Sequence, residues 1–315
     1  MRTYLSILLG VAALTVLGVV AVSLSLDPYR IVHDLPGAYV FEPNTRVSKV
    51  SYLAQKCSAY DAYIVGDSRS AILNGDDMGE IAGRRFFNLA AQADDIVSIV
   101  RRLNFLIAKR CPISAVVIGE SVDVVIGEAP DSLLKTENPS VSGENRLAFY
   151  AKYFLSVQAL MTYAEILRGH PAPRYVYHPD GHVDYMWGMS DSGEFQRARC
   201  GSGKLGDQER QSLLVKLEGY REIARMSARY NFRTIIWIAP LNKWQSSLLD
   251  DPFIKDYLNA LRAIPNLAVI DAERGSPLLA DFHAWHDCEH FRRIVFDQLV
   301  APAAAELLAG SGSKM

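Results

Sequence analysis

Five short apolar runs, separated by longer amphipathic stretches, constrain the fold of this chain more than any other feature. The runs are rich in Val, Ile and aromatic residues and lack polar alternation, which is the pattern of strands covered on both faces. They lie at 62–65, 86–89, 115–118, 234–238 and 267–270, and helical patterns lie at 95–109, 207–230, 252–263 and 292–308. This alternation predicts a three-layer α/β/α sandwich around a five-stranded parallel sheet, with right-handed crossovers.

The interval between the third and fourth runs is too long for one crossover, so we expect an insertion at about 124–206. Within it, residues 145–168 have a helical pattern. Two β-prone runs then flank Pro179-Asp180-Gly181, which is a turn signal. The insertion is therefore expected to contain a helix and a hairpin that overhangs the sheet.

The N-terminal segment carries no charge from residue 3 to about residue 26, which is long enough to cross a bilayer as a helix. We interpret residues 1–26 as a transmembrane signal anchor, and 27–60 as a polar connecting segment. A signal peptide removed after Ala21-Val22-Ser23 and a buried soluble helix are the alternatives. Both export interpretations place the main domain outside the cytoplasm, on the periplasmic side of the inner membrane if the source is bacterial.

The charge and the cysteines narrow the partners and the compartment. A formal net charge of -2 gives no electrostatic reason to expect a nucleic-acid partner. The four cysteines are widely spaced and form no CxxC pair, so they do not indicate zinc. In an oxidising compartment we expect disulfides Cys57–Cys111 and Cys200–Cys288, and free buried thiols are the alternative.

The first candidate site follows the run at 62–65 directly, where the chain reads Gly66-Asp67-Ser68. Ligands of open α/β sheets bind beyond the carboxyl ends of the strands, so a serine here would stand at the crevice. Ser68 is a candidate nucleophile whose backbone N–H could also hold an oxyanion. A helix N-cap is the structural alternative. The pattern departs from Gly-x-Ser-x-Gly because residue 70 is serine.

The second candidate site lies near the C-terminus and supplies what a serine nucleophile needs, a base and a group that orients it. Asp287 and His290 are three residues apart and can face the same side of a turn. His290 is the candidate base and Asp287 its orienting carboxylate, with His283 and His286 as competitors for the base. The alternatives are a polar loop that caps the last helix and a metal site. No HExxH pattern supports a metal, and we expect none.

These motifs resemble the GDSL/SGNH esterase superfamily. Gly66-Asp67-Ser68 is similar to its first block, Asp287-x-x-His290 to its last, and Asn88 lies at the start of a possible second block. The resemblance covers roughly residues 60–300, within a domain that we expect at 61–315, and implies a flavodoxin-like fold. It also implies hydrolysis or transfer of acyl groups with no cofactor. Membrane-anchored relatives of that superfamily include proteins of envelope and exopolysaccharide O-acetylation.

Two positions depart from the pattern of that superfamily. The second block normally carries a glycine whose N–H joins the oxyanion hole, and Ala93 lies nearest to that place here. The third block, Gly-x-Asn-Asp, has an asparagine that donates to the oxyanion. This chain has Gly119-Glu120-Ser121-Val122-Asp123 and no asparagine. Loss of one oxyanion donor typically costs about 10²–10³ in turnover, unless Ser121 or another group takes over.

Other polar residues have supporting or binding interpretations. Asn88, Asp67 and Arg69 are possible supporting residues, although Asp67 is expected to be structural and Arg69 a solvated residue at a helix start. His178, Tyr185 and Trp187 form an aromatic-polar group suited to stacking on sugar rings. An ordinary hairpin contains such residues as well, and we favour that alternative.

The sequence therefore predicts a serine-dependent acyl ester hydrolase or O-acyltransferase. Its substrate would be an acylated glycan of the envelope or an exported polysaccharide, and a membrane acyltransferase is a candidate partner. The main alternative is a catalytically inactive glycan-binding or scaffold protein of a membrane acylation complex, because the third-block asparagine is missing. A lipid-directed esterase is a third interpretation.

Overall fold

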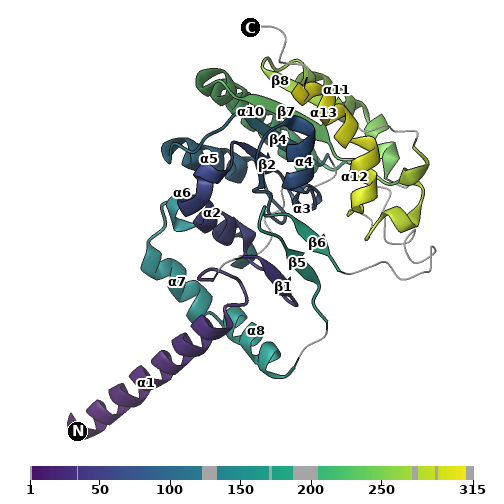
Figure 1. Cartoon of the computed structure of the whole chain (residues 1–315). Helices are drawn as coiled ribbons and strands as arrows, with labels where there is room; N and C mark the ends of the chain where they lie inside the picture. The colour runs from purple at the N-terminus through teal and green to yellow at the C-terminus, as the bar shows by residue number, and fades with distance from the viewer. Residues whose placement is uncertain are drawn as a thin grey trace.

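All five predicted strands form, and they pair in one parallel sheet (Figure 1). The computed structural model describes residues 2–33, 35–122, 133–169, 172–186, 205–243, 245–271, 276–287 and 290–309. The strands are β2 (Ala62–Val65), β3 (Phe86–Asn88), β4 (Ala115–Glu120), β7 (Arg233–Ile238) and β8 (Leu267–Asp271). Their spatial order is β3-β2-β4-β7-β8. The predicted α/β fold is confirmed.

The strand order decides where a site can lie. The chain begins at β2, moves outward to β3, and returns past β2 to β4 before it continues to β7 and β8. The direction of winding therefore reverses between β2 and β4, as in the flavodoxin-like order. Open α/β sheets bind ligands at such a reversal, beyond the carboxyl ends of the strands. Ser68 follows the carboxyl end of β2 directly.

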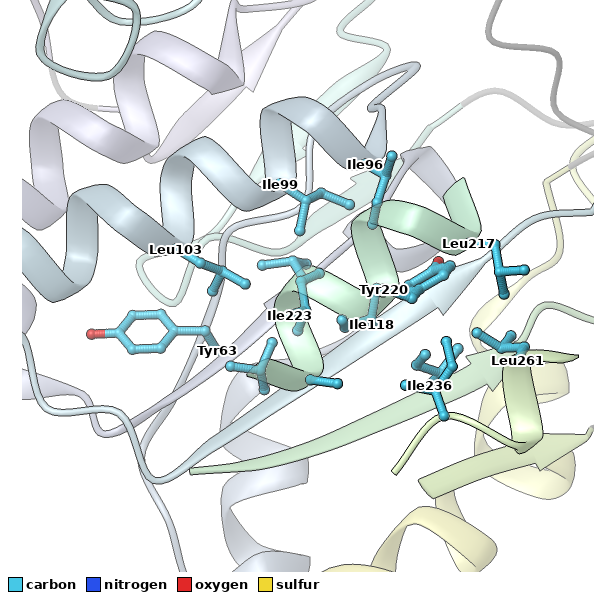
Figure 2. Close-up of a cluster of buried hydrophobic side chains, with 14 of the residues drawn as sticks. Tyr63, Ile96, Ile99, Leu103, Ile118, Leu217, Tyr220, Ile223, Ile236 and Leu261 are labelled. Carbon is cyan, nitrogen blue, oxygen red and sulfur yellow. The ribbon is translucent and has the colours of Figure 1, made fainter. Parts of the chain in front are cut away.

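One face of the sheet is covered by α2 (Thr45–Lys56), α5 (Ile96–Ala108), α10 (Asp207–Tyr230) and α11 (Pro252–Arg262). Alternate strand residues point into this layer. Figure 2 shows Tyr63, Ile118 and Ile236 of the sheet among isoleucine and leucine side chains of the helices. Because β2, β3, β4 and β7 bury both of their faces, burial of apolar area fixes their register on both sides.

The other face packs against α4 (Gly75–Ala82), α12 (Arg293–Leu299) and α13 (Ala301–Ala309), with Ala62, Ile64 and Trp237 from the sheet. The predicted helix at 292–308 is wrong in one respect, because it is interrupted at Val300. Pro302 has no N–H to donate to the carbonyl of Gln298, and its ring would clash with that carbonyl in a continuous helix. The chain therefore starts a new helix.

A second, three-stranded sheet joins two distant parts of the chain. The hairpin of β5 (Tyr175–Tyr177) and β6 (Val183–Tyr185) forms around Gly181 as expected. Gly181 has a φ of 88°, which a residue with a side chain rarely adopts. The third strand is β1 (Gly37–Tyr39), from the connecting segment, and it pairs antiparallel with β5. Neither β1 nor α2 was expected in that segment. The side chain of Asn44 caps α2.

The N-terminal apolar segment forms α1 (Arg2–Leu26), which projects from the body of the protein in Figure 1. Among the described residues it is the one helix long and apolar enough to cross a membrane. Beside its C-terminal end lie α7 (Arg146–Leu155) and α8 (Val157–Leu167). The single helical stretch predicted at 145–168 is thus two helices. Ser156 is extended and caps α8 by accepting the N–H of Ala159.

The remaining helical elements are short: α3 (Ser68–Ala71), α6 (Pro139–Ser142) and single 3-10 turns at Cys57–Ala59, Leu133–Lys135, Ser246–Asp250, Pro277–Leu279 and Phe282–Ala284. Between β4 and α10 the described residues contain α6, α7, α8 and the β5–β6 hairpin. This segment coincides with the expected insertion.

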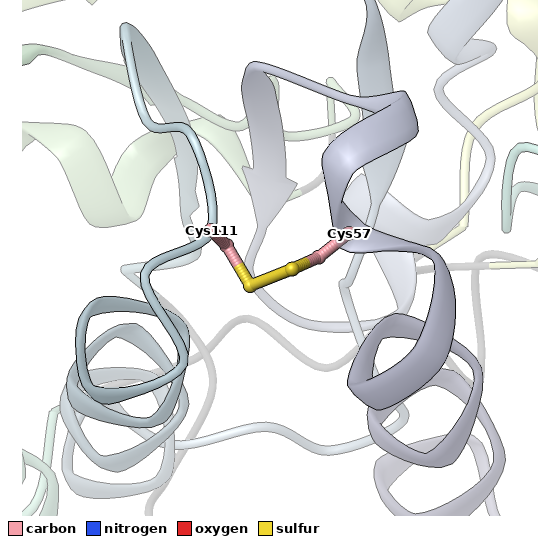
Figure 3. The surroundings of a disulfide bond; sticks show 2 residues. All are labelled: Cys57 and Cys111. Carbon is pink, nitrogen blue, oxygen red and sulfur yellow. A yellow bond between two sulfur atoms is a disulfide. The ribbon is translucent and has the colours of Figure 1, made fainter.

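The predicted disulfide Cys57–Cys111 is present (Figure 3). It joins the residue after α2 to the residues that lead into β4, at the amino-terminal edge of the sheet. Cys200 and Cys288 lie outside the described residues, so their pairing stays a prediction. The apolar helix and the disulfide together indicate a membrane-associated or exported protein.

Candidate active site

The turn after β2 presents Ser68 at the carboxyl edge of the sheet. Gly66 has a φ of 134°, and a Cβ atom there would lie 2.4 Å from the Ser70 Oγ. Asp67 then caps α3, because its Oδ1 accepts the N–H of Arg69 at 2.9 Å. A residue with a side chain at 66 would be both strained and crowded. Glycine at 66 therefore permits the sharp turn, and Asp67 holds it.

The loop at 285–291 closes on itself through its own backbone. Trp285 and Phe291 form an isolated antiparallel bridge, and both side chains are buried. The N–H of His286 donates to the carbonyl of His290 at 2.6 Å. The N–H of His290 donates to Oδ1 of Asp287 at 2.7 Å. This small loop, anchored by two buried aromatic rings, fixes the backbone of His290.

Ser68, His290 and Asp287 are within hydrogen-bonding distance of one another. The Nε2 atom of His290 lies 2.7 Å from the Ser68 Oγ. The Nδ1 atom lies 2.9 Å and 2.8 Å from the two carboxylate oxygens of Asp287. The His290 side chain is 17% exposed. With Nδ1 protonated toward the carboxylate, Nε2 is free to accept a proton from the serine.

Tyr185 supports both the serine and the histidine. Its hydroxyl donates to the backbone carbonyl of Ser68 at 3.0 Å, and Gln92 Nε2 donates to that hydroxyl at 2.8 Å. Its ring meets the His290 ring edge-to-face at 5.5 Å. Burial raises the pKa of Tyr185 well above its usual value, which keeps the hydroxyl protonated as a donor. Tyr185 was considered for sugar stacking, but in the free protein it positions the serine turn.

Asn88 ties the end of β3 to the serine turn. Its Nδ2 donates to the carbonyls of Ser70, Ala71 and Leu73 at 2.8, 3.2 and 2.8 Å. Its Oδ1 accepts the N–H of Ala90 at 3.0 Å. Asn88 is fully buried, and its amide satisfies carbonyls that a single helical turn would leave unpaired. It is a positioning residue.

His178, another predicted binding residue, lies in the turn of the β5–β6 hairpin. The His178 and His182 rings stack at 3.9 Å, His178 pairs with Asp184, and His182 pairs with Asp180. Ligand atoms of His178, His182 and Asp184 lie within 4.8 Å of one another and could hold a metal ion. In this structure the ring nitrogens of His178 and His182 are hydrogen-bonded to Asp184 and Asp180. Trp187 lies outside the described residues.

Asp180 fixes this hairpin to the main sheet. Burial alone would raise the pKa of Asp180, but the hydrogen bond and charge of His182 and the backbone N–H groups of Gly75 and His182 outweigh burial. The pKa of Asp180 is therefore held below its usual value. The hairpin reaches the Ser68 turn through Tyr185, while the His178 side chain is 35% exposed.

Ala93, the candidate oxyanion donor, has a left-handed backbone with a φ of 43°. A non-glycine residue rarely adopts this conformation, and it costs roughly 1–2 kcal/mol. The buried guanidinium of Arg46 donates to the carbonyls of Gln92 and Ala93 at 3.1 and 2.7 Å and holds the turn. Glycine in the resembled pattern would adopt this backbone without strain.

The carboxyl end of β4 takes part in a buried charge network, at the place where the resembled pattern has an asparagine. Oε1 of Glu120 accepts from Lys216 Nζ at 3.1 Å and from the Tyr257 hydroxyl at 3.1 Å. Lys216 also donates to the carbonyl of Ser121 at 2.6 Å. The Ser121 hydroxyl is buried and has no hydrogen-bond partner within the described parts of the chain. Ser121, Glu120 and Lys216 line a small cavity together with Gly66 and Asp67 of the serine turn.

The structure differs from the sequence analysis at Arg69 and adds contacts that the sequence did not predict. Arg69 was expected to be a solvated residue, but it is 2% exposed, so that interpretation is wrong. Sequence reasoning missed the positioning roles of Tyr185 and Gln92 and the contact of Lys216 with Ser121. Spacing could not have revealed them, because Tyr185 and Lys216 lie far along the chain from Ser68 and Ser121.

No model of a known protein family matches this chain, and no curated protein is significantly similar to it. The fold is therefore established by the sheet and its order, and the function has to be argued from the site.

Proposed function

We propose that this protein is a serine-dependent acyl ester hydrolase or O-acyltransferase of the SGNH type. The observation that carries the proposal is the position of the His290 ring. Its Nε2 lies 2.7 Å from the Ser68 Oγ, and its Nδ1 faces both oxygens of Asp287. Serine needs such a base to be nucleophilic, and the base needs a group that fixes its tautomer.

In the proposed mechanism, Ser68 Oγ attacks an ester carbonyl while His290 takes the hydroxyl proton. The carbonyl oxygen becomes negatively charged and is held by the N–H of Ser68, with the N–H of Ala93 as the second proposed donor. The tetrahedral intermediate collapses, the C–O bond to the leaving alcohol breaks, and His290 returns the proton to that alcohol. Water then hydrolyses the acyl-enzyme, or a sugar hydroxyl takes over the acyl group.

Export and the resemblance to envelope O-acetylation proteins support an acylated glycan, in the envelope or an exported polysaccharide, as the substrate. A membrane acyltransferase is the partner that such a role would require if the acyl donor is cytoplasmic. Acetyl esters should then be turned over faster than long-chain esters. The opposite order would favour an esterase directed at lipids.

A second function, an inactive glycan-binding or scaffold protein of an acylation complex, is favoured by one observation. Residues 119–123, at and after the end of β4, include no asparagine or glutamine, and Glu120 is hydrogen-bonded to Lys216 and two tyrosines. Such a protein would keep the serine and histidine in place but turn over esters slowly or not at all.

A fluorophosphonate probe separates the two functions, because it reacts with activated serines and not with ordinary ones. We expect the full chain in detergent to be labelled and Ser68→Ala to abolish the label. Ser70→Ala, two positions along the same turn, is the matched control and should keep it, since the Ser70 side chain is buried. An unlabelled wild-type chain that also fails to turn over acetyl esters would favour the scaffold function.

A further inference from the structure

Helix α8 has an exposed apolar face. Val157, Leu160, Met161, Ala164 and Leu167 recur at intervals of three or four residues and therefore share one side of the helix. Val157, Met161 and Leu167 are 73%, 62% and 70% exposed. Apolar side chains in this arrangement are costly in water, so this face indicates a surface that something apolar covers.

Helix α7 extends this surface with Leu147, Tyr150 and Leu155, and Leu147 is 81% exposed. The opposite sides of both helices are buried, in a core cluster that also contacts α1. That cluster contains Phe149, Tyr153, Ala159 and Tyr163, with Val20 and Leu26 of α1 packed against it. Each helix thus has two apolar faces, and the protein covers one of them.

The position of α1 shows at which level α7 and α8 would lie relative to a membrane that α1 crosses. The hydroxyl of Ser23 donates to the carbonyl of Phe154 at 3.4 Å, and Ser23 is fully buried near the end of α1. From Thr3 to Val20 the helix extends about 27 Å at about 1.5 Å per residue. A bilayer core is about 30 Å thick. A membrane around α1 would therefore end at the level where α7 packs against the C-terminal part of α1 (Figure 1).

We propose that α7 and α8 lie in the surface of the same membrane that α1 crosses, with the exposed apolar residues of both helices facing the acyl chains. This inference rests on the proposed membrane insertion of α1 and is independent of the catalytic proposal. Amphipathic helices bury their apolar face in the boundary between headgroups and acyl chains. Arg146 begins α7 and Arg168 caps α8, where long cationic side chains can reach the phosphates.

Lipid suits this surface better than a protein partner. Gln158, Thr162 and Glu165 form a polar strip along α8, between the buried and the exposed apolar faces. The three faces of α8 therefore point toward the core, toward water and toward an apolar phase. The apolar phase that α1 already requires lies at the same level, so the bilayer covers α7 and α8 without any further component.

Tryptophan fluorescence in lipid nanodiscs tests this inference with the full chain. Met161→Trp adds a reporter on α8, and Leu14→Trp adds one in the middle of α1. Leu214→Trp is the control on α10, where Leu214 is 45% exposed and far from α1. Each variant is compared with the unsubstituted chain, which has four tryptophans, in phosphatidylcholine discs with and without brominated acyl chains. Bromine quenches only tryptophans that reach the acyl region.

We expect most of the added emission to be lost at positions 14 and 161, and none at position 214. If position 14 is quenched but position 161 is not, α1 spans the membrane and the inference for α7 and α8 is overturned. A partner membrane protein would then be the better occupant of their apolar faces. If neither position is quenched, the insertion of α1 fails together with this inference.

Discussion

The turn that presents Ser68 and the loop that follows β4 lie on neighbouring strands, yet they hold their polar groups in opposite ways. In the serine turn, Asp67, Asn88 and Tyr185 satisfy backbone groups around the nucleophile. At the carboxyl end of β4, the Glu120 carboxylate is buried against the ammonium group of Lys216 from α10, and the Ser121 hydroxyl has no partner in the described structure.

The difference separates two requirements of the proposed chemistry. Transfer of the serine proton requires a base beside the hydroxyl and a carboxylate that orients the base. Ser68, His290 and Asp287 have this arrangement. Stabilising an oxyanion requires donors aimed at one point in space, and here the usual side-chain donor is replaced by Glu120 and Ser121. The contacts that the proposed proton transfer needs are therefore present, whereas the proposed oxyanion site lacks its side-chain amide, so we expect that part to limit any activity.

The largest expected effect is the loss of ester turnover when His290 or Asp287 is replaced. His290→Ala should lower ester turnover by about 10⁶, and Asp287→Asn by about 10⁴, because removing the base costs more than removing the group that orients it. Thermal unfolding should change little, since both residues lie in a partly exposed loop. Equal turnover by wild type and His290→Ala would show that any activity arises elsewhere.

The buried pair of Glu120 and Lys216 is expected to have a large effect on the free energy of unfolding. Lys216→Met leaves the Glu120 carboxylate buried without its cation, so unfolding free energy should fall by about 3–5 kcal/mol in chemical denaturation. The double variant with Glu120→Gln should recover much of this loss, because no charge is then buried. If the double variant is no more stable than Lys216→Met, the pair is not the reason that this loop holds its shape.

A substitution at Ser121 tests whether its hydroxyl replaces the missing asparagine as a donor to the oxyanion. If its hydroxyl reaches the oxyanion, Ser121→Ala should lower turnover by about 10²–10³ with little effect on stability, because no hydrogen bond in the free protein is lost. Ser70→Ala is the control, since Ser70 is also a buried serine with no partner among the described residues. Unchanged turnover in Ser121→Ala would leave the backbone N–H groups as the only donors.

The smallest effect is expected at Ala93. Ala93→Gly relieves a left-handed backbone and should raise the free energy of unfolding by about 0.5–1 kcal/mol, the relief being partly offset by the entropy of glycine. Ala91→Gly, a buried residue nearby, should instead destabilise. Thermal unfolding of both variants compares the two positions. Destabilisation by Ala93→Gly would contradict the strained turn.

The fold could be predicted because its strands are buried on both faces. Runs such as 62–65 and 234–238 contain almost only apolar residues, and a parallel sheet needs that pattern. The connecting segment 27–60 was harder to predict, because the helix and strand within it are short and depend on contacts with distant elements. Asn44, for example, caps α2 and also donates to the carbonyl of Leu133.

The candidate site also has a part that the sequence predicts and a part that it does not. Gly66 through Ser68 and Asp287 through His290 are local patterns, and their meeting follows from strand ends that share one edge of the sheet. The surroundings of Ser121 could not be predicted, because Lys216 and Tyr257 come from helices far along the chain. A buried lysine is visible as such only after α10 is placed on the sheet.

The pairing of β1 with β5 determines how the domain can move. A flexible segment with the length of 27–60 would let the domain range over about 30 Å. Because β1 and α2 are part of the folded body, that freedom is lost. If α1 crosses a bilayer, the edge of the sheet that carries Ser68 is held at one distance from the membrane surface, and under the proposed function an acyl donor or acceptor would have to reach it there.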